Sequence, residues 1–406
     1  MTAPVDTLVS ITNCVDGIDT VDAPQTVDTT DRSGLRESRK KRYELQRVAK
    51  AILRQTEHPK GQTWRTLQCA STVNGGAVAV RYTPEIQRAS YAGACICGSV
   101  WVCPVCSARI SELRRAEIAA AHAVHAAAGG TALMLTLTVP HDLDDELRAL
   151  LGRRRKAGNQ GLAGALKRLR DDRIFKCVVE RLGRVGFIRA TEITRGRSGW
   201  HPHYHELWLT TCEENDKLRV PAQRELLRAW KRACRNSGLD VPNQHGVDLR
   251  WAWDASEYLA KIGHEQTWGT ARELATAGTK RGRSGSRNPW QLLRDAGDGD
   301  VPSRALFGEF AQSTLGQRQL IWQRGLKAAL AIADRSDNQL AKHVDADSFV
   351  LAVISADRWR ALLRLPFEWR AQLLDQAEDG GPDAIHDFLD LVEIDPLRAR
   401  VFAGSE

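Results

Sequence analysis

Residues 187–210 constrain the fold more than any other part of this chain, because they have the pattern of two strands joined by a tight turn. Residues 187–194 and 203–210 are both predicted strands, and Gly196-Arg197-Ser198-Gly199 between them is typical of a turn. If the loop consists of residues 196–199, Glu192 lies directly across from His203. The pattern therefore predicts an antiparallel hairpin that brings a carboxylate next to an imidazole.

The second strand of this hairpin carries a candidate metal site. His203 and His205 are two residues apart, so both side chains point to one face of the strand. With Glu192 they would offer two imidazoles and one carboxylate, and leave positions open for a substrate oxygen. Neutral imidazoles suit a divalent transition metal, or Mg²⁺ or Mn²⁺ when oxygen ligands complete the shell. His201 has the same parity, but Pro202 indicates an edge or strand start there, so we expect His201 beside the ligands.

Residues 131–139 also alternate, and they end at Pro140-His141. One face carries Leu133, Leu135, Leu137 and Val139, and the other carries Met134, Thr136 and Thr138. Helices are predicted before this strand, at about 107–128, and after the hairpin, at about 216–237. A further strand is predicted near 247–253, and helical spacing of large apolar side chains returns in the last hundred residues.

The helix predicted at about 254–264 carries a candidate nucleophile. Helical spacing puts Asp254, Tyr258 and Lys261 on one side of it. A phenol is a poor nucleophile at neutral pH and needs a base, a cation or an activated target. Lys261 can stabilise phenolate or phosphate charge, and Asp254 could direct a water molecule. A tyrosine on an amphipathic helix more often packs at the edge of a core, so only the histidine strand makes catalysis the better interpretation.

Nine cysteines suggest a metal site rather than disulfides, because the acidic, polar N-terminus has no secretory pattern and the expected compartment is the reducing cytoplasm. Cys97, Cys103 and Cys106 supply three thiolates with the spacing of a structural zinc site. The fourth ligand could be Cys69 or Cys95. We favour Cys69, because two ligands in Cys95-Ile96-Cys97 would be strained around one tetrahedral ion. Free thiols are the alternative.

The charge balance adds little by itself. Lys and Arg number 58 against 50 Asp and Glu, a formal net charge of +8. A basic run that includes Arg39, Lys40, Lys41 and Arg42 lies on a predicted helix, and it fits either DNA-backbone contacts or a solvated charged face. No stretch approaches the roughly 20 apolar residues of a membrane span.

Taken together, these residues resemble the HUH endonucleases, and among them the plasmid rolling-circle replication initiators with one catalytic tyrosine. Residues 135–141 (Leu-Thr-Leu-Thr-Val-Pro-His) resemble the first motif of the family. Glu192-Ile193-Thr194 followed by residues 201–205 (His-Pro-His-Tyr-His) resembles its metal motif, and residues 258–261 (Tyr-Leu-Ala-Lys) its nucleophile motif. Residues 97–106 and 316–322 resemble a zinc-binding element and a downstream segment of such initiators. The match covers roughly 65–330, with the motifs in the family's order.

The resemblance implies an α+β fold in which a central antiparallel sheet has flanking helices. It also implies Mg²⁺ or Mn²⁺ on His203, His205 and Glu192, and Tyr258 as the nucleophile. His201 and His141 are expected next to these ligands. The family pattern has a Glu four residues before the tyrosine, which activates water at termination, and here that position is Asp254.

We expect a small zinc-binding module before the sheet and a helical C-terminal region after it. The regions expected along the chain are a disordered N-terminus at 1–35, a basic helix at 36–64, the zinc-binding module and a helix at 65–128, the HUH nicking domain at 129–266, a linker at 267–303 and the helical C-terminal region at 304–406.

The expected function is origin binding, single-strand nicking and strand transfer through a 5′-phosphotyrosine intermediate. Expected partners are origin DNA with an extruded single-stranded nick site, a host helicase and a host DNA polymerase. No phosphate-loop motif occurs in the chain, so a partner would unwind the DNA. Oligomers are compatible with this function, and no membrane is involved. The alternatives are a zinc-finger HUH transposase or relaxase, a non-catalytic zinc-stabilised DNA-binding regulator, and a phosphodiesterase that uses water directly.

Overall fold

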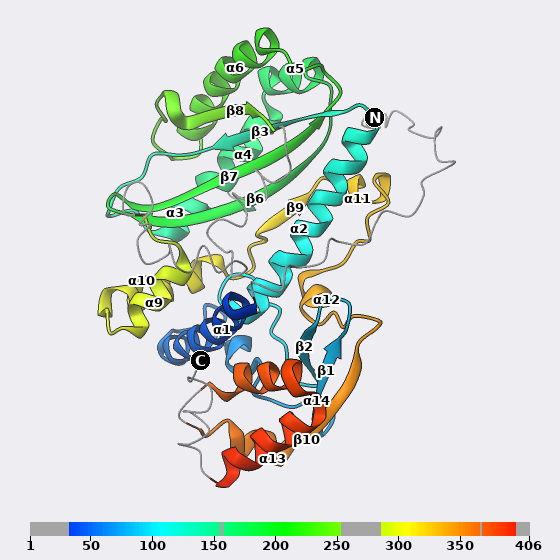
Figure 1. Ribbon diagram of the computed structural model, residues 1–406. Helices are drawn as coiled ribbons and strands as arrows, with labels where there is room; N and C mark the ends of the chain where they lie inside the picture. Colours follow the sequence, from blue (N-terminus) through cyan, green and yellow to red (C-terminus); the bar gives the residue numbers. More distant parts are fainter. Residues whose placement is uncertain (1–31, 153, 156–157, 253–285, 366–367, 395–406) are drawn as a thin grey trace.

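The computed structural model describes residues 32–152, 154–155, 158–252, 286–365 and 368–394. These residues form a mixed α+β structure with a large sheet at one end and a smaller sheet at the other, and helices lie between them and on their faces (Figure 1). The predicted fold class is therefore confirmed.

The large sheet has five strands in the order β8-β3-β7-β6-β9, and every neighbouring pair is antiparallel. Its strands are β3 (Thr131–Leu137), β6 (Arg184–Gly196), β7 (Gly199–Thr210), β8 (Val247–Trp251) and β9 (Leu320–Trp322). The long β6–β7 hairpin lies within this sheet, so β7, which carries the histidines, is paired on both sides.

The alternation of side chains along the strands decides which helices cover each face of the large sheet. Leu133, Tyr204 and Trp208 point to the face covered by α4 (Gly161–Asp171), α5 (Arg173–Arg181) and α6 (Asp216–Arg235). Met134 and Leu207 point to the opposite face, where α2 (Pro104–Ala127) and α11 (Leu326–Ala329) pack. Figure 1 shows α5 and α6 on one side of the sheet and α2 crossing the other.

The small sheet joins the two ends of the described chain. Its order is β10-β1-β2, with β1 (Ala77–Thr83), β2 (Arg88–Ala92) and β10 (Phe349–Ser355) all antiparallel. The helices α13 (Ala356–Leu362) and α14 (Trp369–Ile394) pack on it through Trp359 and Trp369. The C-terminal region is thus mainly helical, but it also gives a strand to the N-terminal module, because residues 349–354 are an uninterrupted apolar run that suits a strand.

The helix α1 (Arg32–Gln55) and the pair α9 (Pro289–Gly297) and α10 (Val301–Thr314) pack together between the two sheets. The structure differs here from the sequence expectation, since α9 lies within the span expected to be a linker. An Asn288–Gln291 capping box starts this helix, and Trp290 is buried in the core that it shares with α1.

The remaining described elements are short. They are η2 (Arg65–Gln68), α3 (Leu147–Leu151), β4 (Arg154–Arg155), β5 (Gly158–Asn159), η3 (Gln244–Gly246) and α12 (Asp337–Ala341).

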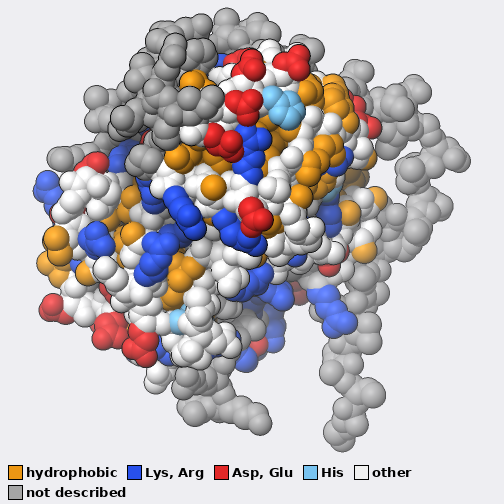
Figure 2. All heavy atoms as spheres, turned by 90° about the horizontal axis from the view of Figure 1, so that it is seen from below, with side chains coloured by type: hydrophobic (Ala, Val, Ile, Leu, Met, Phe, Trp, Pro, Cys, Tyr) orange, Lys and Arg blue, Asp and Glu red, His pale blue; other side chains and the backbone are white. Residues whose placement is uncertain are grey.

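The surface seen from below the view of Figure 1 has Lys and Arg side chains near its middle and hydrophobic side chains gathered toward one side (Figure 2). In β10, the edge strand of the small sheet, Phe349, Val350 and Val353 are exposed. Within the described ranges, none of the helices has both the length and the apolar character needed to cross a membrane.

Candidate functional site

The β6–β7 hairpin brings the three expected ligand side chains together. The register pairs Glu192 with His203, and Gly196 with Gly199. One oxygen of Glu192, Oε2, lies 3.0 Å from Nε2 of His203 and 2.8 Å from Nε2 of His205. A carboxylate oxygen and two imidazole nitrogens therefore converge on one sheet face, a donor set that fits a divalent ion.

The end of the hairpin needs a glycine at position 199. Its φ is +101°, and an added Cβ would lie 1.9 Å from the carbonyl oxygen of Asp142. The hairpin turn is thus in close contact with the loop that contains His141.

Hydrogen bonds on the far side of each imidazole orient the two rings. Nδ1 of His205 lies 3.0 Å from Oγ1 of Thr136, and Nδ1 of His203 lies 3.2 Å from the carbonyl oxygen of His201. A proton on Nδ1 of His203 leaves the Nε2 lone pair directed at Glu192, as metal ligation requires. Thr136 comes from β3, within the span that resembles the first motif of the family, but the sequence assigned no contact to it. Its pairing opposite His205 follows once β3 and β7 are neighbours.

The electrostatics favour an ionised Glu192. Burial alone would raise the pKa of this carboxyl, but the charges and hydrogen bonds of His203 and His205 outweigh burial and hold the pKa well below its ordinary value. The site can therefore supply a charged oxygen ligand over the whole physiological pH range.

His201 and His141 lie beside this group. Their Nδ1 atoms are 3.3 Å apart, and the His201 and His203 rings lie 4.8 Å apart between centroids. Burial, followed by the neighbouring imidazoles of His203 and His141, lowers the pKa of His201 to about 3. His201 is thus neutral at physiological pH, and it adds no positive charge beside the ion-binding atoms.

Four cysteines form a second group, at the start of α2. The Sγ atoms of Cys69 and Cys106 are 3.5 Å apart, those of Cys97 and Cys106 3.6 Å, and those of Cys103 and Cys69 3.7 Å. A tetrahedron with Zn–S bonds of about 2.3 Å has edges of about 3.8 Å. All four residues are buried, whereas Cys95 is outside the group and its backbone bonds to Ala70 and Thr72. The spacing fits a tetrahedral zinc ion.

The helix start explains part of this geometry. Cys103 is the N-cap of α2, Pro104 follows at the first helical position, and Cys106 lies in the first turn. Burial would raise the pKa of Cys103, but hydrogen bonds with Cys106, Cys69 and Cys97 outweigh it and lower that pKa well below its ordinary value. A thiolate at a helix N-terminus is the form that binds a metal.

The expected nucleophile helix cannot be placed. Asp254, Tyr258 and Lys261 lie outside the described residues. The strand β8 ends at Trp251, next to β3 in the sheet and separated from β6 by β3 and β7.

The basic run on α1 differs from the DNA-contact interpretation at one position. Arg39 is buried and forms ion pairs with Asp375, at 2.6 Å, and Glu378, both on α14. Lys41 pairs with Glu37 at 3.3 Å, and burial, with repulsion from Arg39, lowers the pKa of Arg42 to about 10. Arg39 therefore holds the C-terminal helix to α1, and among Arg39, Lys40, Lys41 and Arg42 only Lys40 is exposed.

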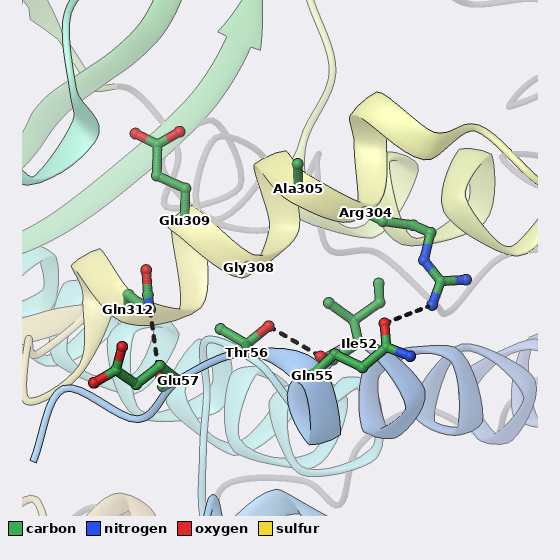
Figure 3. Close-up of a pocket in the computed structure, with 9 residues that line it drawn as sticks. All are labelled: Ile52, Gln55, Thr56, Glu57, Arg304, Ala305, Gly308, Glu309 and Gln312. Carbon is green, nitrogen blue, oxygen red and sulfur yellow. Dashed lines mark hydrogen bonds between the residues drawn. The ribbon is translucent and has the colours of Figure 1, made fainter. Parts of the chain in front are cut away.

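Sequence reasoning also missed Glu309 on α10, which contacts two segments of the site. Its Oε1 accepts a hydrogen bond from the Leu147 backbone N–H at 2.9 Å, and its Oε2 accepts one from Trp200 Nε1 at 2.9 Å. Trp200 precedes His201, and Leu147 starts the helix after the His141 loop. Figure 3 shows the Glu309 carboxylate directed away from α1, on the edge of a cavity of about 390 Å³ between α1 and α10.

Replacing Glu309 with Ala is expected to lower the free energy of unfolding by about 1–3 kcal/mol, because the Trp200 indole and the Leu147 amide lose their acceptors. Urea titration of both proteins measures the change. Gln312→Ala is the matched control one turn further along α10, where the side chain donates a hydrogen bond to the exposed carbonyl of Glu57. This substitution is expected to lower the free energy of unfolding by at most about 0.5 kcal/mol. Equal losses in the two variants would contradict the role given to Glu309.

The fold and the two groups define a class of protein: an antiparallel-sheet protein with a carboxylate–imidazole group on the sheet and a buried four-cysteine group in an adjoining module. A family model described as a replication protein matches residues 89–343. The chain belongs to this replication-protein family, which confirms the resemblance to plasmid replication initiators.

Individual relatives agree with the family. Protein rep of Streptomyces lividans is 31% identical over 350 residues, which cover 71% of this chain and 76% of that protein. The neomycin resistance protein of Streptomyces cyanogenus is 32% identical over 229 residues, which cover 50% of each chain. No solved structure matches the chain significantly.

Proposed function

We propose that this protein starts rolling-circle replication of a plasmid by nicking one strand of the origin with Tyr258. The observation that carries the proposal is the convergence of Glu192, His203 and His205 on one sheet face of a replication-family protein. A carboxylate with two neutral imidazoles holds a divalent ion and leaves room for a substrate oxygen, which suits phosphodiester chemistry.

Glu192, His203 and His205 would hold Mg²⁺ or Mn²⁺, and the bound ion would polarise the scissile phosphate. The Tyr258 phenol loses its proton and its oxygen attacks phosphorus, so the Tyr O–P bond forms while the P–O3′ bond breaks. The leaving 3′ oxygen takes up a proton, so the step neither gains nor loses protons overall. Lys261 stabilises the charge that develops on the phenolate and the phosphate. The products are a 5′-phosphotyrosine link, which conserves the phosphodiester energy for strand closure, and a 3′-hydroxyl for a host polymerase.

Termination and unwinding complete the proposed cycle. Asp254 would direct water at the end of replication, with a side chain one methylene shorter than the Glu of the family pattern. A host helicase would separate the strands. Zinc on Cys69, Cys97, Cys103 and Cys106 would fix the start of α2 and the loops that precede it.

The test is incubation of the protein with a single-stranded oligonucleotide from the replication origin, labelled at its 3′ end, with and without Mn²⁺. We expect cleavage that depends on the ion and leaves the labelled fragment linked to protein on a denaturing gel. A free 5′-phosphate on that fragment would indicate direct hydrolysis by water. Binding with no cleavage at any Mn²⁺ concentration would indicate a regulator without catalysis.

A further inference from the structure

Three arginines surround one buried glutamate on the face of the large sheet opposite the His203–His205 group. We call this the arginine cluster: Arg170 from α4, Arg184 and Arg189 from β6, and Glu206 from β7. Arg170 Nη2 lies 2.7 Å and Arg189 Nη1 3.6 Å from Oε1 of Glu206, whose Oε2 accepts a hydrogen bond from Trp208. Glu206 directly follows His205, so the cluster and the metal ligands occupy opposite faces of the same strand.

The charges of the arginine cluster do not balance. Burial would raise the pKa of Glu206, but Arg170, Arg189 and Arg184 outweigh burial and lower it, so the carboxylate is ionised. Arg170 lies against the Glu206 carboxylate, whereas Arg184 has no carboxylate within ion-pair distance among the described residues, so its positive charge is in excess there. Burial lowers the pKa of Arg184 to about 10. The Glu206 carboxylate acts in the opposite direction and raises this pKa, and repulsion from Arg170 lowers it further. The excess charge is thus unfavourable for the protein alone.

Hydrogen-bond donors of the cluster are also unsatisfied. Nε and Nη1 of Arg184 and Nε of Arg170 are buried and have no hydrogen-bond partner among the described residues. Arg184 lies over the rings of Trp208, Phe187 and Phe175, at 4.8, 5.2 and 5.4 Å from their centroids. The aromatic rings attract the guanidinium charge, but they are poor hydrogen-bond acceptors for its N–H groups. A buried donor without an acceptor lowers the stability of the folded protein by about 1–3 kcal/mol.

We propose that the arginine cluster is an anion site that binds a backbone phosphate of DNA. A guanidinium fork matches phosphate oxygens, and a phosphate would supply both the missing negative charge and acceptors. The cluster reaches the surface through Arg170, whose side chain is 24% exposed, and through the half-buried Arg184. The choice of DNA rests on the proposed function. DNA held there would contact Arg170 and Arg184 where they reach the surface, on the side of the sheet away from the ion, which anchors the duplex without occupying the nicking face.

The competing explanation is structural, because an arginine stacked among three aromatic rings could simply cover the start of β6. Arg184→Met separates the two explanations. Methionine can pack against the same rings and leaves Arg170 to neutralise Glu206. A phosphate site predicts weaker DNA binding with a Tm no lower than that of the wild type. A structural stack predicts a lower Tm with unchanged DNA binding.

The experiment measures binding of a duplex oligonucleotide of arbitrary sequence as a function of salt, with no divalent ion present. For Arg184→Met we expect the slope of log K against log salt concentration to fall by about 1, the contribution of one phosphate contact. Arg181→Gln is the matched control: it removes the same charge at the end of α5, where Arg181 pairs with Glu225 at 2.8 Å outside the cluster. An unchanged slope in Arg184→Met, or an equal change in Arg181→Gln, overturns the proposal.

Inorganic phosphate gives a second measurement that does not depend on DNA. At constant ionic strength, phosphate in place of chloride is expected to raise the Tm of the wild-type protein and not that of Arg184→Met. No rise in the wild type overturns the anion site even if the variant folds poorly. A rise accompanied by an unchanged DNA slope would assign the site to free phosphate and overturn the DNA contact. Because neither measurement involves cleavage, a failure of the nicking proposal would appear separately.

Discussion

Tyr258→Phe is expected to reduce strand cleavage by more than about a thousandfold and to abolish the covalent protein–DNA adduct. The phenol oxygen becomes the bridging atom of the phosphotyrosine, and phenylalanine keeps the ring but lacks that atom. DNA binding in the absence of a divalent ion should change little, since the substitution alters no charge. Single-turnover cleavage of the origin oligonucleotide measures the loss.

Tyr204→Phe is the matched control for this experiment. Tyr204 lies on β7 between the two histidines, but it is buried on the opposite face in the core under α4 and α6. We expect its removal to leave the adduct intact. Cleavage that survives in Tyr258→Phe, or that is lost only in Tyr204→Phe, would assign the nucleophile elsewhere.

Cys106→Ser is expected to remove one zinc ion per chain and to lower the Tm by at least about 10 °C. Cys106 touches two other sulfurs of the group, and three thiolates hold zinc far less well than four. The group lies in the core that α1, α9 and α10 share, so its loss would loosen the packing of these helices between the two sheets. Zinc content by elemental analysis and a thermal melt measure both effects.

Cys95→Ser provides a control two residues from a cysteine of the group. The backbone of Cys95 forms hydrogen bonds within the module, but its sulfur is not part of the four-cysteine group. The zinc content of Cys95→Ser should therefore be unchanged, and its free energy of unfolding should fall by about 1 kcal/mol or less. Equal zinc loss in both variants would replace Cys69 by Cys95 in the proposed ligand set.

The local parts of the candidate site were predictable because they depend on short-range geometry. A strand alternates its side chains, and a hairpin fixes its register through its turn, so the position of Glu192 opposite His203 follows from Gly196 and Gly199. Cys69 was preferred to Cys95 as the fourth ligand because Cys95 and Cys97 are too close in sequence to bind one tetrahedral ion without strain. The structure places the Cys69 sulfur in the group.

Features that depend on contacts between distant segments were not predictable. Arg39 looked like part of a basic surface, but α14, more than three hundred residues later, supplies Asp375 and Glu378 as its partners. The span read as a linker contains α9, because α1 covers its apolar face. The spacing of charged and apolar residues along a helix shows which side is charged or apolar, but it does not show which distant segment packs against that side.

The sequence by itself determined four strands of the large sheet (β3, β6, β7 and β8), the shared face of Glu192, His203 and His205, and the cysteines available for zinc, because each follows from spacing along one or two neighbouring segments. The fifth strand, β9, lies where helical spacing was predicted, and its pairing with β6 became visible only in the structure. Only the tertiary structure decided that β10 completes the N-terminal sheet, that Glu309 bonds both Trp200 and the helix after His141, and that three arginines meet around Glu206. Those contacts join segments far apart in the chain, and their geometry exists only after the helices and sheets have packed.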